Sequence, residues 1–370
     1  MDETGETVDS RLLPLVSIVT PVYNNRADIA ECIESVLAQS YRNWEYSIVD
    51  NCSTDGSAEI AHQYAAQDPR IRVHENYRFL RAIPNHNLAL RQISAKSKYC
   101  KIVFADDWIF PQCLEQMVSV AEKHPSVGIV GAYGLQGSEV MWTGLPHPSS
   151  LVSGRDICRR LFVEGTYVFG TPTSLLYRAD LVRSHNPFYN EANLHADMET
   201  CVVLLKTCDF GFVHQILTFK RLRPGSLGMI TEDINTLRAG HLHILVTHGP
   251  QFLTKKELET CLHRRVAEYY NFLAVSLMRG RRDSKFWNYH KRKLTEAGVS
   301  FRWSRLIGAM LARLTRATIN PNETIEKLRK WRSAERPATT GHLALFTEEG
   351  SDVRSTPEHL VPDNLDTRSG

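Results

Sequence analysis

The sequence predicts an α/β fold with a mostly parallel sheet flanked by helices, followed by a mainly helical, basic C-terminal region. Three observations support this prediction. Short runs of β-branched and aromatic residues alternate with segments that carry apolar residues at helical spacing. Polar loops follow the first, second and fourth of these runs, and beyond about residue 231 the pattern becomes helical and basic. Right-handed crossovers between parallel strands bring the strands' carboxyl ends, with their loops, to one edge of the sheet.

Two strand–helix pairs open the chain. The first strand is an apolar run that stops at Pro21, and the helix after it repeats apolar residues at helical spacing. The second strand ends at Asp50, and Ser57 is a good N-cap for the helix that follows. The predicted elements are strand 15–20, helix 27–38, strand 44–49 and helix 58–66.

The alternation then continues to residue 130. The fourth strand is a short apolar run that enters two adjacent aspartates, and Pro111 suits the first turn of the next helix. Beyond Gly131 the pattern loosens, and Gly170 and Pro172 make the entry to one strand irregular. The predicted elements are strands 71–73, 102–104, 127–130, 140–143, 168–177 and 212–219, and helices 83–93, 112–122 and 197–205.

Charge is distributed unevenly along the 370 residues. The net charge is +3, yet the segment from Lys255 to Arg336 holds 20 lysines and arginines against 8 acidic residues. We expect four parts: an N-terminal tail (1–13), the α/β domain (14–230), a helical basic region (231–333) and a disordered tail (334–370).

The eight cysteines form no C-x-x-C pair, so neither a zinc ribbon nor a thioredoxin-type site is indicated. Their apolar surroundings are typical of reduced thiols in a cytosolic protein. The first ten residues lack the features of a signal peptide, and no window approaches the roughly 20 apolar residues of a membrane span. We therefore expect a cytoplasmic protein.

Asp106 and Asp107 follow the fourth strand directly. Unpaired carboxylates are costly to bury, so we expect both in the strand-to-helix loop, at the edge where open α/β sheets bind ligands. Two adjacent negative charges repel each other, and a divalent cation such as Mg²⁺ or Mn²⁺ would relieve the repulsion. The alternative is a solvated pair that caps the next helix.

The loop Thr20–Asn24, the loop Asp50–Ser57 and the Asp106–Asp107 pair together resemble the family 2 glycosyltransferases. That family has a nucleotide-sugar-binding α/β fold of the kind called GT-A. The order and spacing of the motifs match the family pattern over roughly residues 15 to 227. The resemblance implies an inverting enzyme with a nucleotide-sugar donor, UDP-linked by expectation, and a divalent cation, Mn²⁺ or Mg²⁺.

The resemblance also implies roles for residues on the nucleotide side. Thr20, Pro21, Tyr23 and Asp50 match the positions that hold the nucleoside. A carboxylate can accept from a base N–H, and an aromatic ring can stack on the base. Asp55 and Gly56 are interpreted as the turn that presents Asp50.

Asn87 matches a family asparagine near the nucleotide, although His86 stands where the family often has arginine. In the metal motif, Phe104 replaces the first aspartate. The resemblance makes Asp106 the carboxylate that touches both metal and donor, with Asp107 beside it as a second metal residue.

Asp197 matches the family's catalytic base, which removes the proton from the acceptor hydroxyl. The alternative for Asp197 is a helix N-cap, a common position for aspartate before an apolar run. Glu199 is interpreted as helix surface or a first-turn dipole partner. Arg221 and Arg223 match a basic segment that closes the family's site, and both could contact the diphosphate because arginine suits bidentate phosphate contacts.

Other functions fit the sequence less well. A nucleotidyltransferase needs a glycine-rich, basic phosphate loop after the first strand, and residues 20–25 contain neither glycine nor lysine. No G-x-G-x-x-G motif follows a strand, which argues against a dinucleotide oxidoreductase. A non-catalytic nucleotide-sugar-binding module on the same fold remains an alternative, although the retained Asp106, Asp107 and Asp197 argue against it.

Family members often build bacterial surface polysaccharide or lipopolysaccharide, so we expect a glycan or lipid-linked acceptor and no nucleic-acid partner. Residues 301–314 place apolar side chains on one helical stripe and arginines on another. This pattern fits a helix that lies on an anionic membrane at the inner face of the cell membrane. The alternative is a helix packed on the catalytic domain with a solvated basic face.

Overall fold

The computed structural model describes residues 13–221, 234 and 236–319. The chain divides into two compact units, residues 1–261 and 262–370. The first unit continues past residue 230, where the α/β domain was expected to end. The tail predicted at 334–370 and all but Leu13 of the N-terminal tail lie outside the described residues.

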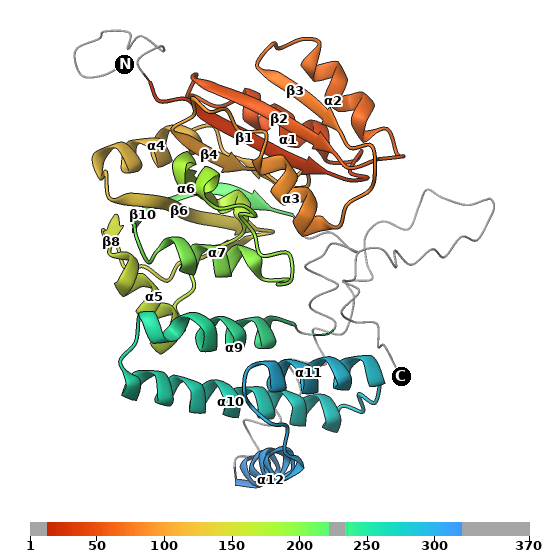
Figure 1. The fold of residues 1–370 in the computed structure, drawn as a ribbon, viewed down its shortest axis with the longest axis vertical. Coiled ribbons are helices and arrows are strands. Elements are labelled where there is room, and N and C mark those ends of the chain that lie inside the picture. Colours follow the sequence, from red (N-terminus) through yellow and green to blue (C-terminus); the bar gives the residue numbers. More distant parts are fainter. Residues whose placement is uncertain (1–12, 222–233, 235, 320–370) are drawn as a thin grey trace, which may run out of the picture. The chain divides into compact units, whose positions relative to one another are not determined.

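Within the described residues of the first unit, a ten-stranded sheet forms the framework (Figure 1). Its strands are β1 (Val16–Val22), β2 (Trp44–Asp50), β3 (Ile71–Glu75), β4 (Tyr99–Ile102), β5 (Trp108–Ile109), β6 (Val127–Gln136), β7 (Glu139–Met141), β8 (Leu151–Val152), β9 (Leu175–Arg178) and β10 (Asp209–Lys220). The spatial order is β3-β2-β1-β4-β9-β6-β10-β5, with β7 beside β6 and β8 beside β10.

The main strands β1 to β4 are parallel, as are β6 and β10, whereas β9 runs antiparallel between β4 and β6. The carboxyl ends of β1, β2, β4 and β10 therefore share one edge of the sheet, called the rim below. Because β9 is reversed, its first residues also lie at the rim. The predicted mostly parallel α/β sheet is confirmed.

Helices cover the sheet of the first unit. One apolar cluster joins β1 to two helices. It contains Val16, Ile18 and Val22 of β1, Cys32, Ile33 and Val36 of α1, and Leu114 and Met117 of α4. In addition, α3 packs on β1 and β2, and α6 packs on β4 and β9. The helices of this unit are α1 (Ile29–Leu37), α2 (Ser57–Ala65), α3 (Ala82–Leu90), α4 (Cys113–Lys123), α5 (Gly154–Val163), α6 (Ala179–Ser184), α7 (Ala196–Leu204) and α9 (Thr236–His248), with short 3-10 turns η1 (Pro172–Ser174) and η2 (Gly249–Gln251).

The fourth strand, predicted over 102–104, is β4 and already ends at Ile102, so it does not enter the aspartates. Three further sequence expectations were wrong in detail. Strand β1 does not stop at Pro21 but runs through it to Val22. The pairing of β1 with β4 ends at Val19, and the backbone nitrogen of Pro21 faces the β4 side of the strand. Because β1 has no strand partner on that side at residue 21, the missing N–H of proline costs no hydrogen bond between strands. The strand predicted over 168–177 is confined to β9, because Gly170 adopts a positive φ of 67° and Pro172 begins η1.

The third difference is the N-cap of α2, which is Gly56 rather than Ser57. In addition, α5 was not predicted, although Ser153 caps it by accepting from the Asp156 amide at 3.1 Å. All eight cysteines are free thiols, as expected, and seven of them are buried.

The second unit is helical, as predicted for the basic region. It contains the greater part of α10 (Lys255–Met278), together with α11 (Ser284–Glu296) and α12 (Trp303–Ile319). Tyr269, Phe286 and His290 form its buried centre, where the Tyr269 hydroxyl lies 2.7 Å from His290 Nδ1. Across the described residues, no helix combines the length and apolar character needed to span a membrane.

Thr20 has a role inside the sheet. Its side chain is fully buried, and Oγ1 lies 2.7 Å from both the Tyr46 hydroxyl and the Val103 carbonyl oxygen. The hydroxyl therefore joins β1 to β2 and to the segment after β4. These bonds fix the end of β1 and the loop that follows it.

We predict that Thr20→Val lowers the free energy of unfolding by about 1–3 kcal/mol, because the buried Tyr46 hydroxyl and Val103 carbonyl each lose a partner. Urea unfolding measures this change. The matched control is Thr260→Val at an exposed position of α10, where we expect a change within about 0.5 kcal/mol. Equal unfolding midpoints for the two variants would contradict the structural role of Thr20.

Candidate functional site

The loops after β1 and β2 are bonded to each other at the rim. The Asn24 amide donates to Ser53 Oγ at 3.0 Å, and the Thr54 amide donates back to Asn24 Oδ1 at 2.8 Å. The Asn25 amide donates to Ser57 Oγ at 2.8 Å. These bonds hold the two motif loops as one rigid surface.

The turn at Asp55 and Gly56 completes this surface, consistent with the structural role expected for it. Asp55 accepts from the Arg26 amide at 2.9 Å and from the Ser57 amide at 3.0 Å. Gly56 has a φ of 94°, and a Cβ there would lie 2.5 Å from Arg26 Nη1. The positive φ therefore favours glycine at this turn, since other residues are strained in that conformation.

Asp50 ends β2 and is almost completely buried. Its Oδ2 accepts from the Ser53 amide at 3.0 Å, whereas Oδ1 is buried without a hydrogen-bond partner among the described residues. A buried carboxylate oxygen without a partner is costly, and a ligand that donates to it removes the cost. Asp50 therefore has the chemistry needed to accept a base N–H.

Tyr23 lies next to this region with an exposed ring, directly after β1. Its ring meets that of Phe79 edge to face, with 4.8 Å between the ring centroids. The segment carrying Phe79 is held by Asn51, whose side chain donates to the Leu80 carbonyl at 2.7 Å and accepts from the Leu80 amide at 2.9 Å. Sequence reasoning missed Phe79, since no motif residue marks it.

The Asp106–Asp107 loop is positioned by the pairing of β5 with the end of β10. Trp108 pairs with Phe219 in the antiparallel register, and their rings stack with centroids 4.7 Å apart. This pairing brings the two aspartates to the residues that follow Phe219. Helix α4 begins with Gln112 as its N-cap, so the aspartate pair does not cap that helix.

Asp107 is buried, and both of its oxygens are used by the protein. Oδ2 accepts from the Thr173 hydroxyl at 2.6 Å, and Oδ1 accepts from the Arg221 amide at 3.1 Å. Burial, and then the neighbouring charge of Asp106, raises the pKa of Asp107 to about 7. Asp106 is only half-buried, so it is the more accessible carboxylate of the pair.

Arg221 binds the rim itself. Its guanidinium pairs with Asp28 at 3.2 Å and with Glu31, and its Nε donates to the Asp106 carbonyl at 3.2 Å. These bonds tie the end of β10 to the first turn of α1 and to the aspartate loop. Arg223, the other expected diphosphate contact, lies outside the described residues.

Asn87 is bonded to the loop before α7. Its amide nitrogen donates to the Tyr189 carbonyl at 2.9 Å and to Glu191 at 3.0 Å, and its Oδ1 accepts from the Tyr189 amide at 2.8 Å. These bonds use both amide hydrogens. His86, beside it, packs on Phe104, and burial lowers the pKa of His86 to about 4.

Asp197 lies in the first turn of α7 but is not its N-cap, which is His195. Its Oδ1 accepts from the next amide, that of Met198, at 2.9 Å. Burial raises the pKa of Asp197, while the charges of His195 and Lys220 lower it in part. A raised pKa makes a carboxylate a stronger base than an exposed one.

Lys220, which sequence reasoning missed, links the two groups of carboxylates. It is the last residue of β10, and its positive charge lowers the pKa of both Asp107 and Asp197. The same lysine thus offsets negative charge at both carboxylates. The signal available in the sequence was a lysine at the end of a strand, beside Arg221.

Glu199 was interpreted as helix surface or a first-turn dipole partner. It does lie in the first turn of α7, but the surface interpretation is wrong because its side chain is buried. Burial raises the pKa of Glu199, but hydrogen bonds from two histidines and two asparagines outweigh burial and hold the pKa below its ordinary value. The donors are His243 at 3.5 Å, His248 at 3.3 Å, Asn193 at 2.9 Å and Asn190 at 3.0 Å. Glu199 therefore fastens α7 to α9 and to the loop before α7.

The described part of the chain contains no group of three histidine, cysteine or acidic side chains arranged to hold a metal ion. A Mg²⁺ or Mn²⁺ ion that shares phosphate oxygens with its substrate uses only one or two protein carboxylates. Asp106 fits that kind of site because it is only half-buried and lies next to Asp107, whose pKa is raised.

Comparisons with known proteins identify the family of this chain. The sequence model described as "Glycosyl transferase family 2" matches residues 17–184. EpsE of Bacillus subtilis is 36% identical over 155 residues, covering 39% of this chain and 54% of EpsE. TuaG of the same organism, named for teichuronic acid biosynthesis, is 36% identical over 127 residues, covering 34% of this chain and 49% of TuaG. The chain thus spans about half the length of each.

The glycosyltransferase GlyG of Streptococcus pneumoniae is 33% identical over 243 residues, which cover 60% of this chain and 76% of GlyG. The solved structure of S. aureus TarS in complex with UDP-GlcNAc superposes with a TM-score of 0.57 at 16% identity, covering 77% of this chain and 81% of that one. The likeness to TarS shows the GT-A-like fold. On these matches, with its motifs carried on that fold, the chain belongs to the family 2 glycosyltransferases.

Proposed function

We propose that this protein is an inverting glycosyltransferase that moves a sugar from a UDP-linked donor to a hydroxyl of a glycan or lipid-linked acceptor. The observation that carries the proposal is the arrangement of carboxylates at one rim. Asp50 has a buried oxygen without a partner, Asp106 is accessible beside buried Asp107, and Lys220 acts on both Asp107 and Asp197. Asp50 and Asp106 are thus available for donor binding, and Asp197 is available for proton removal.

On the donor side, Asp50 accepts from the base and Tyr23 stacks on it, with Pro21 and Thr20 supporting their loop. TarS binds UDP-GlcNAc in its solved structure, which supports a uridine donor here. A divalent cation at Asp106, with Asp107 behind it, supplies positive charge to the diphosphate when bound. Asn87 and Arg221 shape the walls of the site through their bonds to neighbouring loops.

On the acceptor side, Asp197 takes the proton of the attacking hydroxyl. Its raised pKa favours that transfer, and Lys220 offsets negative charge as the nucleotide leaves. Attack from the face opposite the leaving diphosphate inverts the anomeric carbon. A positioned general base of this kind typically contributes about 10² to 10⁴ in rate.

The setting we propose is surface polysaccharide synthesis, supported by the name of TuaG. Lipid-linked acceptors of such pathways lie at a membrane surface. We place the enzyme in the cytoplasm, with peripheral contact to an anionic membrane through its basic C-terminal region.

We expect UDP and at least one UDP-sugar to raise the melting temperature in a panel of nucleotide sugars, because a ligand that binds only the folded state stabilises it. Asp50→Asn removes a charge-assisted acceptor and should weaken UDP binding roughly 10- to 100-fold. Asp180→Asn, an exposed aspartate on α6, is the matched control and should bind normally. No response to any nucleotide sugar would sink the donor assignment.

Metal dependence is tested by chelation. Excess EDTA should abolish transfer, and Mn²⁺ or Mg²⁺ should restore it. Asp106→Asn should lose the metal response, whereas Asp107→Asn, whose oxygens already bind Thr173 and Arg221, should keep a metal response at reduced turnover. Full turnover in excess chelator is the result that would overturn a metal role.

The role of Asp197 is tested by Asp197→Asn, which preserves size and can still accept from the Met198 amide. Turnover should fall by about 10² or more, with melting temperature and donor affinity near those of the unaltered protein. Glu199→Gln is the contrasting variant, since loss of its buried charge should lower the melting temperature. Asp197→Asn with near-normal turnover would assign the base to another residue. Donor binding without any turnover in the unaltered protein would favour a non-catalytic module.

A further inference from the structure

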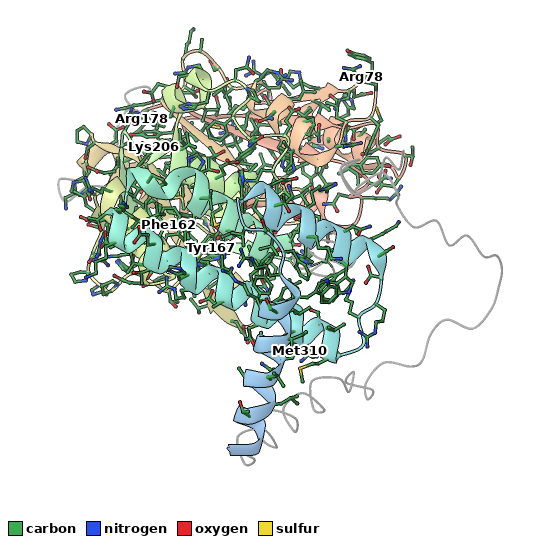
Figure 2. The ribbon with its side chains drawn as sticks, turned by 60° about the horizontal axis from the view of Figure 1, so that its bottom comes forward. Arg78, Phe162, Tyr167, Arg178, Lys206 and Met310 are labelled. Atoms are coloured by element: carbon green, nitrogen blue, oxygen red, sulfur yellow. The ribbon has the colours of Figure 1, made fainter. Side chains whose placement is uncertain are left out.

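Helix α12 in the second unit carries a row of exposed apolar side chains. Trp303, Ile307, Leu311 and Leu314 are 57%, 53%, 57% and 49% exposed. They recur at intervals of three or four residues, which places them on one side of the helix. Figure 2 shows Met310, from the same stretch, projecting from α12. Leu306, in contrast, is completely buried and attaches the helix to its unit. Contiguous exposed apolar patches of this kind mark interaction surfaces.

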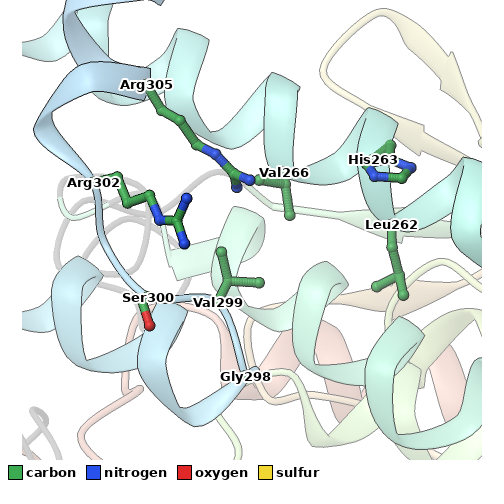
Figure 3. Close-up of a pocket in the computed structure, with 8 residues that line it drawn as sticks. All are labelled: Leu262, His263, Val266, Gly298, Val299, Ser300, Arg302 and Arg305. Atoms are coloured by element: carbon green, nitrogen blue, oxygen red, sulfur yellow. The ribbon is translucent and has the colours of Figure 1, made fainter.

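A basic cavity adjoins the first turn of this helix. It has a volume of about 300 Å³ and lies between α10 and the segment that enters α12. Figure 3 shows Arg302 and Arg305 extending toward the same space above Val266 and Val299, with His263 farther along α10. Within the described residues, neither guanidinium has a carboxylate partner.

The surrounding charge has one sign. Residues 262–319 contain 13 lysines and arginines and three acidic residues, and none of the acidic residues lies beyond Glu296. The Lys291 ammonium lies 5.4 Å from the Phe301 ring and 5.5 Å from the Trp303 ring. A positive charge therefore lies beside Trp303, the first residue of the exposed apolar row on α12, which is called the α12 stripe below. Excess positive charge beside an exposed apolar stripe is the composition of helices that lie in anionic membrane interfaces.

We propose that the second unit binds an anionic lipid bilayer, with the α12 stripe in the interface and a lipid phosphate in the cavity at Arg302 and Arg305. Arginine binds phosphate oxygens through two donors at once. Tryptophan prefers the level of the lipid headgroups, and Trp303 lies in the same turn as both arginines.

A bilayer suits this surface better than a second copy of the chain, because two such basic surfaces would repel each other. A soluble phosphate accounts for the cavity but leaves the apolar stripe exposed. The proposal specifies the membrane contact described under the proposed function and does not depend on sugar transfer, since binding is measured without donor or acceptor.

The test is cosedimentation of the full-length protein with vesicles of phosphatidylglycerol in phosphatidylcholine, compared with phosphatidylcholine alone. We expect binding to the anionic vesicles that weakens as salt rises. Arg302→Gln with Arg305→Gln should reduce partitioning about 25-fold, taking about 1 kcal/mol for each basic residue. The matched control, Arg282→Gln with Lys285→Gln, removes equal charge at exposed positions outside the cavity and should have a much smaller effect.

The stripe is tested separately. Ile307→Glu with Leu311→Glu should abolish vesicle binding, whereas Ser304→Glu with Ala312→Glu adds the same charge off the stripe and should preserve most of it. Circular dichroism checks that each variant remains folded. Absence of binding by the unaltered protein overturns the proposal, as does an equal loss of binding in the Arg302/Arg305 and Arg282/Lys285 double variants. So does sedimentation as a dimer that the stripe variant alone dissociates, or stabilisation by inorganic phosphate without vesicle binding.

Discussion

The short antiparallel pairing between β5 and the end of β10 is the constraint on which the site depends. It joins Trp108 to Phe219 and thereby sets Asp106 and Asp107 beside Lys220 and Arg221, more than 100 residues away in the chain. The Arg221 amide then bonds to Asp107, and its guanidinium reaches Asp28 and Glu31. Loss of this pairing would separate the aspartate loop from Lys220 and Arg221.

A balance of charge follows from that arrangement. Burial and the neighbouring charge of Asp106 raise the pKa of Asp107, and burial raises the pKa of Asp197, so ionisation of both is opposed. Backbone amides, hydroxyl groups and Lys220 offset part of that cost. The negative charge that is not offset favours the binding of a cation and of hydrogen-bond donors.

The sequence predicted the fold class and most elements because helical spacing and β-branched runs are local properties. It also predicted that Asp50, Asp106 and Tyr23 would share one edge, since parallel strands place their carboxyl ends together. It did not distinguish a contacting residue from a supporting one. Thr20, Asn87 and Arg221 bond to groups between 26 and 190 residues away, and no local pattern reports such partners. The positions of Lys220 and Phe79 near the site, and the burial of Glu199, also result from packing between distant segments.

The reversed direction of β9 has a consequence for how such a protein can diversify. Because β9 starts at the rim, the connection before it, which carries Thr173, opens onto the site, while the helix α6 that follows lies beyond the other end of the strand. The segment between β6 and β9 can therefore become longer or shorter without shifting the register of β1 to β4. Strands β1 to β4 are complete before residue 108, so a change in that later connection leaves this half of the sheet intact.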